Sequence, residues 1–405
     1  MLKNIGTAIL IFCLTALSAG AAFAADGASN DDLLRARELS KSVNAFAFDL
    51  YKEIAKEEKG SIFFSPLSIS MALALAYEGA AGETREEMRR VLHYDDNVGK
   101  QFRAYLDVLN NTTKKSGEFL LANAAWLDIH LNIREKYVDT LKKYYDSKAT
   151  KIDYSDTHGA AEAINLWCYR NTKGKIKKIV VPGDLKGCRL ALGNAAYFKA
   201  EWQRGFRKER TAPMPFHRSE KEVVEYPMMK TRGNYKYYED KKIQSLTMPY
   251  KDGIFAMIAI LPKEIRYMKK IEKELGEALL SKILSCYDIA NVNLCLPRFM
   301  IEENYQMAYC LRAIGMNKAL SSAANFSGIT GMPGLYIDKV IHKAIAGVTE
   351  EGSEAAATTV IIMNKILPPP GKRRVIEFTA DRPFLFFILD NRTNTIMFMG
   401  KWVGE

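Results

Sequence analysis

The stretch from Thr349 to Pro383 constrains the fold of this 405-residue chain more than any other. Between Glu354 and Lys365 it is rich in alanine, threonine and isoleucine and carries neither proline nor charge. Strand geometry sends alternate side chains to one face of a sheet, and one face of this segment is small at its start and increasingly apolar toward its end. The residues of that face are Ser353, Ala355, Ala357, Thr359, Ile361 and Met363. Such a face can be buried in a sheet.

The second half of the stretch has the opposite character. It carries Pro368–Pro370, a glycine and the basic run Lys372–Arg374, which together are typical of an exposed, non-helical loop. A segment that can be either loop or buried strand predicts a conformational switch. The alternative is a helix followed by a proline-rich linker, because Ala355–Ala357 favours a helix while the β-branched run Thr358–Ile362 resists it. Composition alone leaves these two interpretations about even.

The flanking residues decide between them. Three runs resemble the signature of the serpin family: Lys339-Val-Ile-His-Lys-Ala-Ile-Ala-Gly-Val-Thr-Glu-Glu-Gly-Ser-Glu-Ala-Ala-Ala357, Phe378-Thr-Ala-Asp-Arg-Pro-Phe-Leu-Phe-Phe-Ile388 and Phe398-Met-Gly-Lys401. Further motifs that resemble this family lie at Ser61–Thr84, Leu121–Trp126, Ile164–Ile176 and Leu192–Trp202. The resemblance therefore spans practically the whole chain, from Phe46 to Val403.

The resemblance implies an α+β fold of three β-sheets and about nine helices with an exposed reactive-centre loop. We expect one domain over residues 39–405, because no proline-, glycine- or serine-rich linker divides the chain. Residues 25–38 would form an N-terminal lead-in. The loop would cover about residues 350–376 and be exposed from Gly352 to roughly Val375.

The resemblance also implies a bacterial-like serpin of the inhibitory type. Such a protein is not an enzyme. In this family the loop is bait for a serine protease, which becomes acylated on the residue before the cut. The freed N-terminal half of the loop then inserts into the main sheet and distorts the protease. The implied partner is a trypsin-like or elastase-like serine protease in a covalent 1:1 complex with a serpin monomer. No cofactor, metal, nucleic acid or membrane is expected to bind.

Two groups of residues carry this mechanism in the family. The hinge at the start of the loop enters the sheet first: Glu350, Glu351, Gly352, Ser353, Glu354, Ala355, Ala356, Ala357 and Thr358. The second group, at the shutter and breach of the main sheet, acts as a gate and not as a catalyst: Ser65, Ser68, Asn194, Trp202 and His342. One departure is Gly193, where the family usually has a branched apolar residue. Glycine in a central strand is expected to cost stability and to loosen the sheet locally.

The reactive bond can be placed in two ways. Counting from the hinge glycine as the family does gives Ile366–Leu367, with Lys365–Ile366 one residue away. Counting back from Phe378 gives Lys372–Arg373, because this loop is longer than in many relatives. The basic run attracts trypsin-like proteases, but about six extra residues would add roughly 20 Å of slack to an inserted strand. We therefore expect productive cleavage at Ile366–Leu367 or Lys365–Ile366 and futile cleavage at Lys372–Arg373.

Residues 1–24 predict a secretory signal peptide of bacterial type, with Lys3 in a positive n-region, the apolar core Ile5–Leu17 and the cleavage motif Ala22-Phe-Ala24. A membrane anchor is the alternative, but the apolar run is short. We expect a secreted protein, extracellular or periplasmic. The net charge of +11, one unit of which belongs to Lys3, is mostly interspersed with acids, which favours a solvated basic surface over a nucleic-acid module.

The remaining residue patterns indicate no catalytic or metal centre. The mature chain keeps five cysteines without a Cys-x-x-Cys pair: Cys168, Cys188, Cys286, Cys295 and Cys310. An odd number fits neither a disulfide framework nor a metal site, and we expect most of them in the core. The sequence contains no Gly-x-Ser-x-Gly or His-Glu-x-x-His motif.

Three other functions stay open. A non-inhibitory serpin, acting as a carrier, chaperone or storage protein, typically has bulky, charged or proline residues in the hinge, whereas this chain has Ser353-Glu-Ala-Ala-Ala-Thr-Thr359. Cross-class inhibition of cysteine proteases and activation by a polyanion are both compatible with the sequence. An exported solute-binding protein would need two lobes around a ligand cleft, of which the sequence gives no sign.

Overall fold

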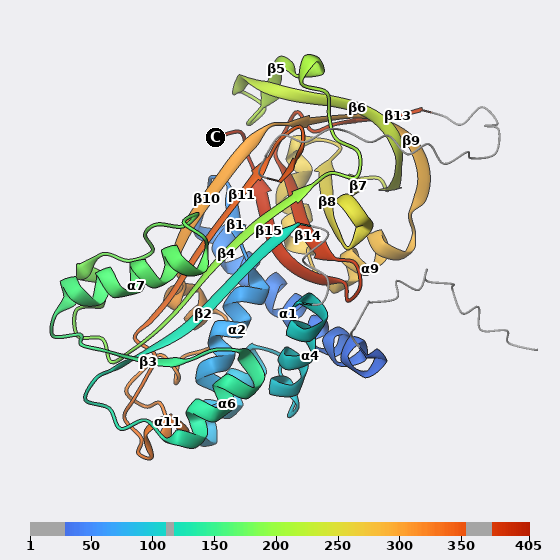
Figure 1. The fold of residues 1–405 in the computed structure, drawn as a ribbon. Coiled ribbons are helices and arrows are strands. Elements are labelled where there is room, and N and C mark those ends of the chain that lie inside the picture. The colour runs from blue at the N-terminus through green and yellow to red at the C-terminus, as the bar shows by residue number, and fades with distance from the viewer. Residues whose placement is uncertain (1–28, 111–116, 354–374) are drawn as a thin grey trace, which may run out of the picture.

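The computed structural model describes residues 29–110, 117–353 and 375–405 of the chain. The expected signal peptide, the hinge residues Glu354–Thr358 and all of the candidate reactive bonds therefore lie outside the described residues. The described part combines a tall sheet that has helices on both faces with a larger sheet that packs across its upper end (Figure 1). This arrangement confirms the α+β fold class.

The described residues contain ten α-helices, close to the nine expected. Their bounds are α1 Asn30–Glu57, α2 Pro66–Tyr77, α3 Gly82–Val91, α4 Val98–Asn110, α6 Glu135–Tyr145, α7 Thr157–Asn171, α8 Met268–Glu274, α9 Glu277–Ser285, α10 Ala308–Ala313 and α11 Ser327–Thr330. Within the described ranges, none of the helices combines the length and the apolar content needed to cross a membrane.

Helix α1 begins with a capped first turn. Its N-cap is Ser29, whose hydroxyl accepts a hydrogen bond from the Asp32 amide (3.1 Å), while the Asp32 carboxylate accepts one from the Ser29 amide (3.2 Å). This reciprocal capping box satisfies two amides that the first turn leaves unpaired. Part of the expected lead-in, residues 30–38, thus belongs to this helix.

The main sheet has five strands side by side, of which all but β3 are long (Figure 1). Their order is β10 (Phe299–Gln306), β11 (Lys339–Val348), β4 (Leu190–Glu201), β2 (Glu118–Asp128) and β3 (Ala149–Ile152). In the centre, Lys339–Ile345 of β11 pairs in parallel with Ala191–Tyr197 of β4. On its other edge β4 pairs antiparallel with β2. A two-residue strand, β12 (Gly352–Ser353), also pairs with β4.

The second sheet contains nine strands in the described residues. Eight follow the order β1 (Ile62–Phe64), β15 (Thr395–Trp402), β14 (Phe384–Asp390), β8 (Phe255–Pro262), β7 (Ile243–Pro249), β6 (Val223–Glu239), β9 (Asp288–Pro297) and β13 (Val375–Thr379), and β5 (Ala212–His217) pairs with β6. Three sheets were expected, and hydrogen bonding joins two of them. The cause is the 17-residue strand β6, because Lys236–Glu239 pairs with β7 while Met228–Tyr237 pairs with β9.

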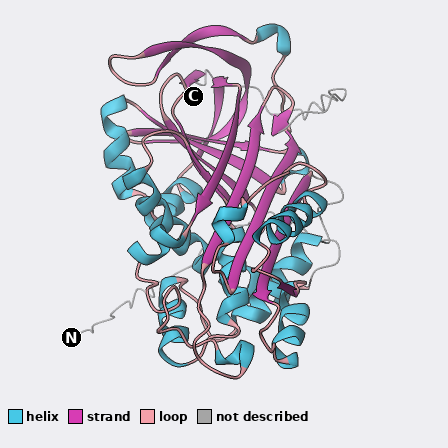
Figure 2. Ribbon diagram, turned by 90° about the vertical axis from the view of Figure 1, so that its left-hand side faces the viewer, coloured by secondary structure: helices cyan, strands magenta, loops and turns pink. Residues whose placement is uncertain are grey.

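Different helices cover the two faces of the main sheet (Figures 1 and 2). Helix α2 lies beneath it and is buried along its whole length, as its apolar sequence predicts. Helix α7 lies on the opposite face. Alternate side chains of strand β4 point to opposite faces of the sheet. Leu192 and Phe198 join the core on the α2 side, whereas Ala191 and Ala195 join the cluster beneath α7.

Gly193 in β4 has a packing role that the sequence did not reveal. A Cβ atom at this residue would come within 2.3 Å of the Trp126 indole ring. Trp126 packs edge-on against Trp167 of α7, with 5.0 Å between the ring centroids. The glycine was expected to loosen the sheet. A branched side chain would instead collide with Trp126, so the glycine makes room for the contact between β2 and α7.

Candidate functional site: the hinge turn and the gate cluster

The chain reverses direction directly after β11. The Thr349 amide donates to the Gly352 carbonyl (2.8 Å), and Gly352–Ser353 then pairs with Ala200–Glu201 of β4 in antiparallel register. This pairing lies just beyond the last residue pair between β11 and β4. We call residues 349–353 the hinge turn.

Gly352 and Ser353 were expected in the exposed loop, and this expectation is wrong, because both are buried. Their place depends on a close approach of two backbones. A Cβ atom on Gly352 would come within 2.0 Å of the Ala200 carbonyl oxygen, so only glycine lets the chain reach β4 here. The start of the hinge is therefore already a strand of the main sheet.

Ser353 faces the interior with its hydroxyl satisfied. That hydroxyl lies 2.6 Å from the Tyr250 hydroxyl, and either oxygen can be the donor. Tyr250 stacks on Trp202 with 4.4 Å between the ring centroids. Burial raises the pKa of Tyr250, so the phenol keeps its proton. A small hydroxyl side chain can thus enter the sheet here without leaving a buried polar group unpaired.

Hydrogen bonds to its backbone carbonyls fasten the hinge turn to the segment that follows β4. The Trp202 indole N–H donates to the Thr349 carbonyl (2.9 Å), and the Trp202 amide donates to the Glu351 carbonyl (2.8 Å). The Phe206 amide donates to the Glu350 carbonyl (2.8 Å). Trp202 was expected among the gate residues, and it lies here, against the hinge turn.

Two glutamates of the hinge turn differ in burial and in the exposure of their partners. Glu350 is 3% exposed, accepts a hydrogen bond from the Thr211 hydroxyl (2.8 Å) and lies 3.5 Å from the Arg298 guanidinium. Glu351 pairs with the exposed Lys208 at 2.5 Å, and the hydrogen bond from that ammonium holds the pKa of Glu351 below its usual value. An exposed ion pair of this kind adds little to stability, so Glu350 is the stronger attachment.

The other expected gate residues meet beneath the main sheet, at the start of α2. The Ser65 amide donates to His342 Nε2 (3.0 Å), and the Ser65 hydroxyl donates to the Met397 carbonyl (2.7 Å). The Ser68 hydroxyl donates to Asn194 Oδ1 (3.2 Å), which also accepts from His342 Nδ1. We call Ser65, Ser68, Asn194 and His342, with the Asn123 described below, the gate cluster. It ties α2 to both β4 and β11.

His342 is a neutral hydrogen-bonding group in this cluster. It is fully buried, and burial lowers its pKa to about 3. Because Nε2 accepts from the Ser65 amide, the ring proton sits on Nδ1 and is donated to Asn194. A histidine with this pKa does not exchange protons near neutral pH, which fits a structural role and not general acid–base chemistry.

The sequence analysis missed Asn123 of β2. It lies directly opposite Asn194 in the β2–β4 pair, and its amide group has no hydrogen-bond partner within the described ranges. The Asn194 Nδ2 atom also has no hydrogen-bond partner among the described residues. A signal was present, since Asn-Ala-Ala occurs at both Asn123 and Asn194, each in a strand of similar composition. Unpaired buried amides are costly and mark a place where another polar group can fit.

The five expected gate residues therefore lie at two places on the main sheet. Asn194 and Trp202 are both reached along β4 and are eight residues apart, which corresponds to about 26 Å of extended strand. Trp202 holds the start of the loop, whereas Asn194 holds β11 to β4 through His342. The two places lie at the top and near the middle of the same inter-strand boundary.

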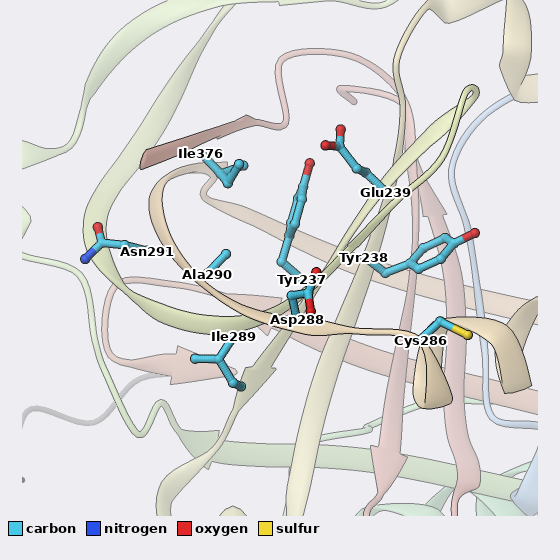
Figure 3. A pocket seen from close by; sticks show the side chains of 9 residues that line it. All are labelled: Tyr237, Tyr238, Glu239, Cys286, Asp288, Ile289, Ala290, Asn291 and Ile376. Atoms are coloured by element: carbon cyan, nitrogen blue, oxygen red, sulfur yellow. The ribbon is translucent and has the colours of Figure 1, made fainter. Parts of the chain in front are cut away.

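The far end of the loop is anchored at β13, which pairs in parallel with β9. A cavity of about 560 Å³ lies beside this anchor (Figure 3). Figure 3 shows side chains from three segments around it: Tyr237–Glu239 of β6, Cys286 with the start of β9, and Ile376 of β13. The two loop ends are thus fixed on different sheets.

The cysteines agree with the expectation of core residues for the most part. All five are unpaired thiols, and Cys168, Cys188 and Cys295 are buried, while Cys310 is half-buried and Cys286 is exposed. Burial raises the pKa of Cys168 to about 12, and those of Cys188 and Cys295 to about 11, so these thiols are inert. The described parts of the chain hold no cluster of side chains suited to a metal ion.

A main sheet with the start of a loop already paired to a central strand is an architecture for strand addition. Comparison with known proteins gives it a family. The family model described as Serpin (serine protease inhibitor) matches residues 41–404. An uncharacterized serpin-like protein of Thermococcus kodakarensis is 38% identical over 367 residues, which cover 90% of this chain and 85% of that protein. Serpin B3 of Homo sapiens is 33% identical over 388 residues, which cover 90% of this chain and 98% of that protein.

Solved structures agree with the sequence comparison. Serpin48 of the insect Tenebrio molitor, described as a highly specific serpin, has a TM-score of 0.81 and 31% identity and covers 91% of this chain and 98% of its own. Uncleaved ovalbumin has a TM-score of 0.80 and 28% identity and covers 91% of this chain and 100% of its own. The chain belongs to the serpin family, whose members are generally protease inhibitors and not catalysts.

Proposed function

We propose that this serpin is a secreted suicide inhibitor of serine endopeptidases. The observation that supports it most is the placement of Ser353. The first inward-facing residue of the inserting segment already pairs with β4, and its side chain contacts the core. Only the β11–β4 pairs and the gate cluster separate this start from a full-length inserted strand.

Continuing the register of β12 gives the inserting segment a good fit. It would set Ala355 opposite Phe198, Ala357 opposite Ala196, Thr359 opposite Asn194, Ile361 opposite Leu192 and Met363 opposite Leu190. Directly opposite residues share a face, so the graded series would face the α2 side of the sheet. Thr359 would bring a hydroxyl beside Asn194, whose Nδ2 atom has no partner within the described ranges. Insertion would therefore offer a partner to a polar group that the uncleaved fold leaves unpaired.

The same register favours a cut at Ile366–Leu367 or Lys365–Ile366. Strand β4 begins at Leu190, opposite Met363, so a protease acylated on Ile366 would be drawn to within about three residues of the end of the sheet. A cut at Lys372–Arg373 would leave about nine residues, or roughly 30 Å of extended chain, between sheet and protease. The protease would then not be pulled tight and would complete hydrolysis.

The proposed target is an extracellular or periplasmic protease of trypsin-like or elastase-like specificity. Lys365 suits a trypsin-like specificity pocket and Ile366 suits an elastase-like one. Residues 1–24 support export of the protein. The second candidate function, a non-inhibitory serpin, is less favoured because the hinge has no bulky or proline residue.

The direct experiment mixes the chain from Ala25 with trypsin, elastase and the cysteine protease papain. We expect a denaturant-resistant 1:1 complex with a serine protease and a released C-terminal peptide that begins at Leu367 or Ile366. A peptide from a stable complex that begins at Arg373 would overturn the register argument. Loop cleavage without any complex would favour the non-inhibitory function, and a stable papain complex would assign cross-class inhibition.

A further inference from the structure

A larger cavity is lined by residues outside the hinge turn and the gate cluster. It has a volume of about 1060 Å³, is half-open, and is lined by the C-terminal end of α1, by α8 and by the C-terminal residues of the chain. Its apolar wall consists of Ala55, Ile265, Met268, Pro383 and Val403. A volume of this order is typical of pockets that hold small organic ligands.

Two helices present lysines to this cavity. Lys52, Lys56 and Lys59 lie on one face of α1 and its C-terminal extension, and Lys269 and Lys273 lie one turn apart on α8. Lys56 is paired with Glu53 at 2.7 Å. The other four ammonium groups have no carboxylate within ion-pair distance among the residues that the structure describes. They therefore contribute uncompensated positive charge to the cavity.

The carboxylate at the base of the cavity does not offset this charge. Glu272 accepts a hydrogen bond from the Tyr51 hydroxyl (2.8 Å) and one from the buried Lys401 ammonium (3.3 Å). Its charge is thus balanced by Lys401 within the wall. Of the remaining carboxylates that line the cavity, Glu222 pairs with Arg218 (3.0 Å) and Glu405 accepts a hydrogen bond from the Ser61 amide (3.1 Å), while Glu58 lies at the end of α1.

We propose that this cavity binds an amphiphilic anion, a linear alkyl chain that ends in a carboxylate. The lysines of α1 and α8 attract the carboxylate, and the apolar wall covers the alkyl chain. A neutral chain lacks the charge interaction, and an inorganic anion lacks the apolar contact, so both halves of the ligand are needed. This site is independent of the proposed protease inhibition, because it shares no residue with the hinge turn or the gate cluster.

The test uses the chain from Ala25 and the fluorescent probe 11-(dansylamino)undecanoate. We expect saturable enhancement of probe fluorescence, displacement by dodecanoate, at least tenfold weaker displacement by dodecanol and none by phosphate at the same concentration. The double substitution Lys269→Glu and Lys273→Glu should raise the Kd about tenfold, as two reversed charges at a half-open site imply. Lys270→Glu is the matched control, because Lys270 lies on the same helix and does not line the cavity. It should leave the Kd within about twofold.

A second variant guards against misfolding of the first. Ala55→Phe fills the cavity from the α1 wall, keeps every lysine and should abolish probe binding while the melting temperature stays close to that of the unmodified protein. If the double variant does not fold, probe binding by Ala55→Phe tests the proposal on its own. Unchanged binding in Ala55→Phe, an equal loss in Lys270→Glu, or phosphate that displaces the probe as readily as dodecanoate overturns the proposal.

Discussion

The hinge turn and the gate cluster both hold the boundary of β4, but they do so by different chemistry. The hinge turn is attached mainly through backbone carbonyls, with one ion pair at the surface. The gate cluster consists of neutral side chains that are fully buried except for the half-buried Asn123, and it leaves two side-chain amides unpaired in the described chain. Water can replace the surface pair of the hinge turn at little cost, whereas it cannot reach the gate cluster without the sheet opening.

Under the proposed function, the hinge turn marks the start of strand insertion and the gate cluster marks its barrier. The hinge turn defines where a strand begins, because β12 is already in register. The gate cluster defines how hard it is to continue, because His342 and Asn194 must part before a strand can pass between β11 and β4. The predictions below disturb one region or the other, from the largest expected effect to the smallest.

Cleavage of the loop is expected to give the largest change. If the hinge turn begins an insertion that the gate cluster delays, cutting the loop lets the strand pass the gate and complete the sheet. The melting temperature should then rise, because new strand pairs and burial of the graded apolar face replace an incomplete sheet. Calorimetry before and after limited proteolysis measures this. An unchanged or lower melting temperature would contradict the inhibitory mechanism.

Ser353→Arg should turn an inhibitor into a substrate. Ser353 is fully buried and contacts Tyr250, so a guanidinium there would be buried without a charged partner. The strand would be expelled at its first residue, and the protease would escape before it is trapped. The measurement is the ratio of complexed to merely cleaved protein. Ser353→Thr, which keeps the hydroxyl, is the control and should stay close to the unmodified protein. Equal trapping by Ser353→Arg would show that this residue does not lead insertion.

His342→Leu should weaken the gate cluster without touching the hinge turn. It removes the partner of the Ser65 amide and one partner of Asn194 Oδ1 in a fully buried site. Such a loss costs about 2–4 kcal/mol of unfolding free energy. Urea denaturation of the uncleaved protein measures it. A loss below about 0.5 kcal/mol would mean that the cluster does not hold the strands together.

The pH dependence of stability should also report on the gate cluster. The pKa of His342 is about 3 in the fold and about 6.5 in an unfolded chain, so the unfolded state binds the proton more readily. Stability is therefore fully present above pH 6.5 and falls as the pH drops toward 3, by about 2–3 kcal/mol at pH 4.5. His342→Gln cannot titrate and should decline less steeply in urea unfolding at pH 7, 5.5 and 4.5. Equal slopes would contradict the assignment.

The smallest effects concern the side-chain contacts of the hinge turn. Thr211→Val removes the hydroxyl bond to the buried Glu350 and should lower the unfolding free energy by about 1–2 kcal/mol. Lys208→Ala removes only the exposed partner of Glu351 and should leave stability within experimental error. Thermal unfolding of the two variants compares them. A larger loss in Lys208→Ala than in Thr211→Val would reverse the ranking of the two attachments.

The sequence predicted the central strand β4 through the family resemblance of Leu192–Trp202, a run that is largely apolar but contains no β-branched residue. It also predicted that Ser65, Asn194 and His342 meet, through the family resemblance. It did not predict the buried start of the hinge. That placement depends on hydrogen bonds from Trp202 and on the approach of Gly352 to Ala200, which join residues about 150 apart in the chain.

Two other features escaped the sequence for a similar reason. Gly193 was interpreted from strand propensity alone, but its meaning depends on an indole from the neighbouring strand. The cavity between α1 and α8 depends on lysines that are more than 200 residues apart and that carry no shared motif. Asn123 is different, because its Asn-Ala-Ala motif repeats that of Asn194 and could have been recognised from two antiparallel neighbours.

The strand directions in the main sheet determine how an added strand would pair with its neighbours. Neighbours in the centre of the main sheet alternate up and down, except that β11 and β4 point the same way. A strand that continues β12 would run against both of them, and each of its ladders would have the perpendicular hydrogen bonds of antiparallel pairs. Under the proposed function, one added strand would therefore replace the parallel ladder between β11 and β4 with two antiparallel ladders.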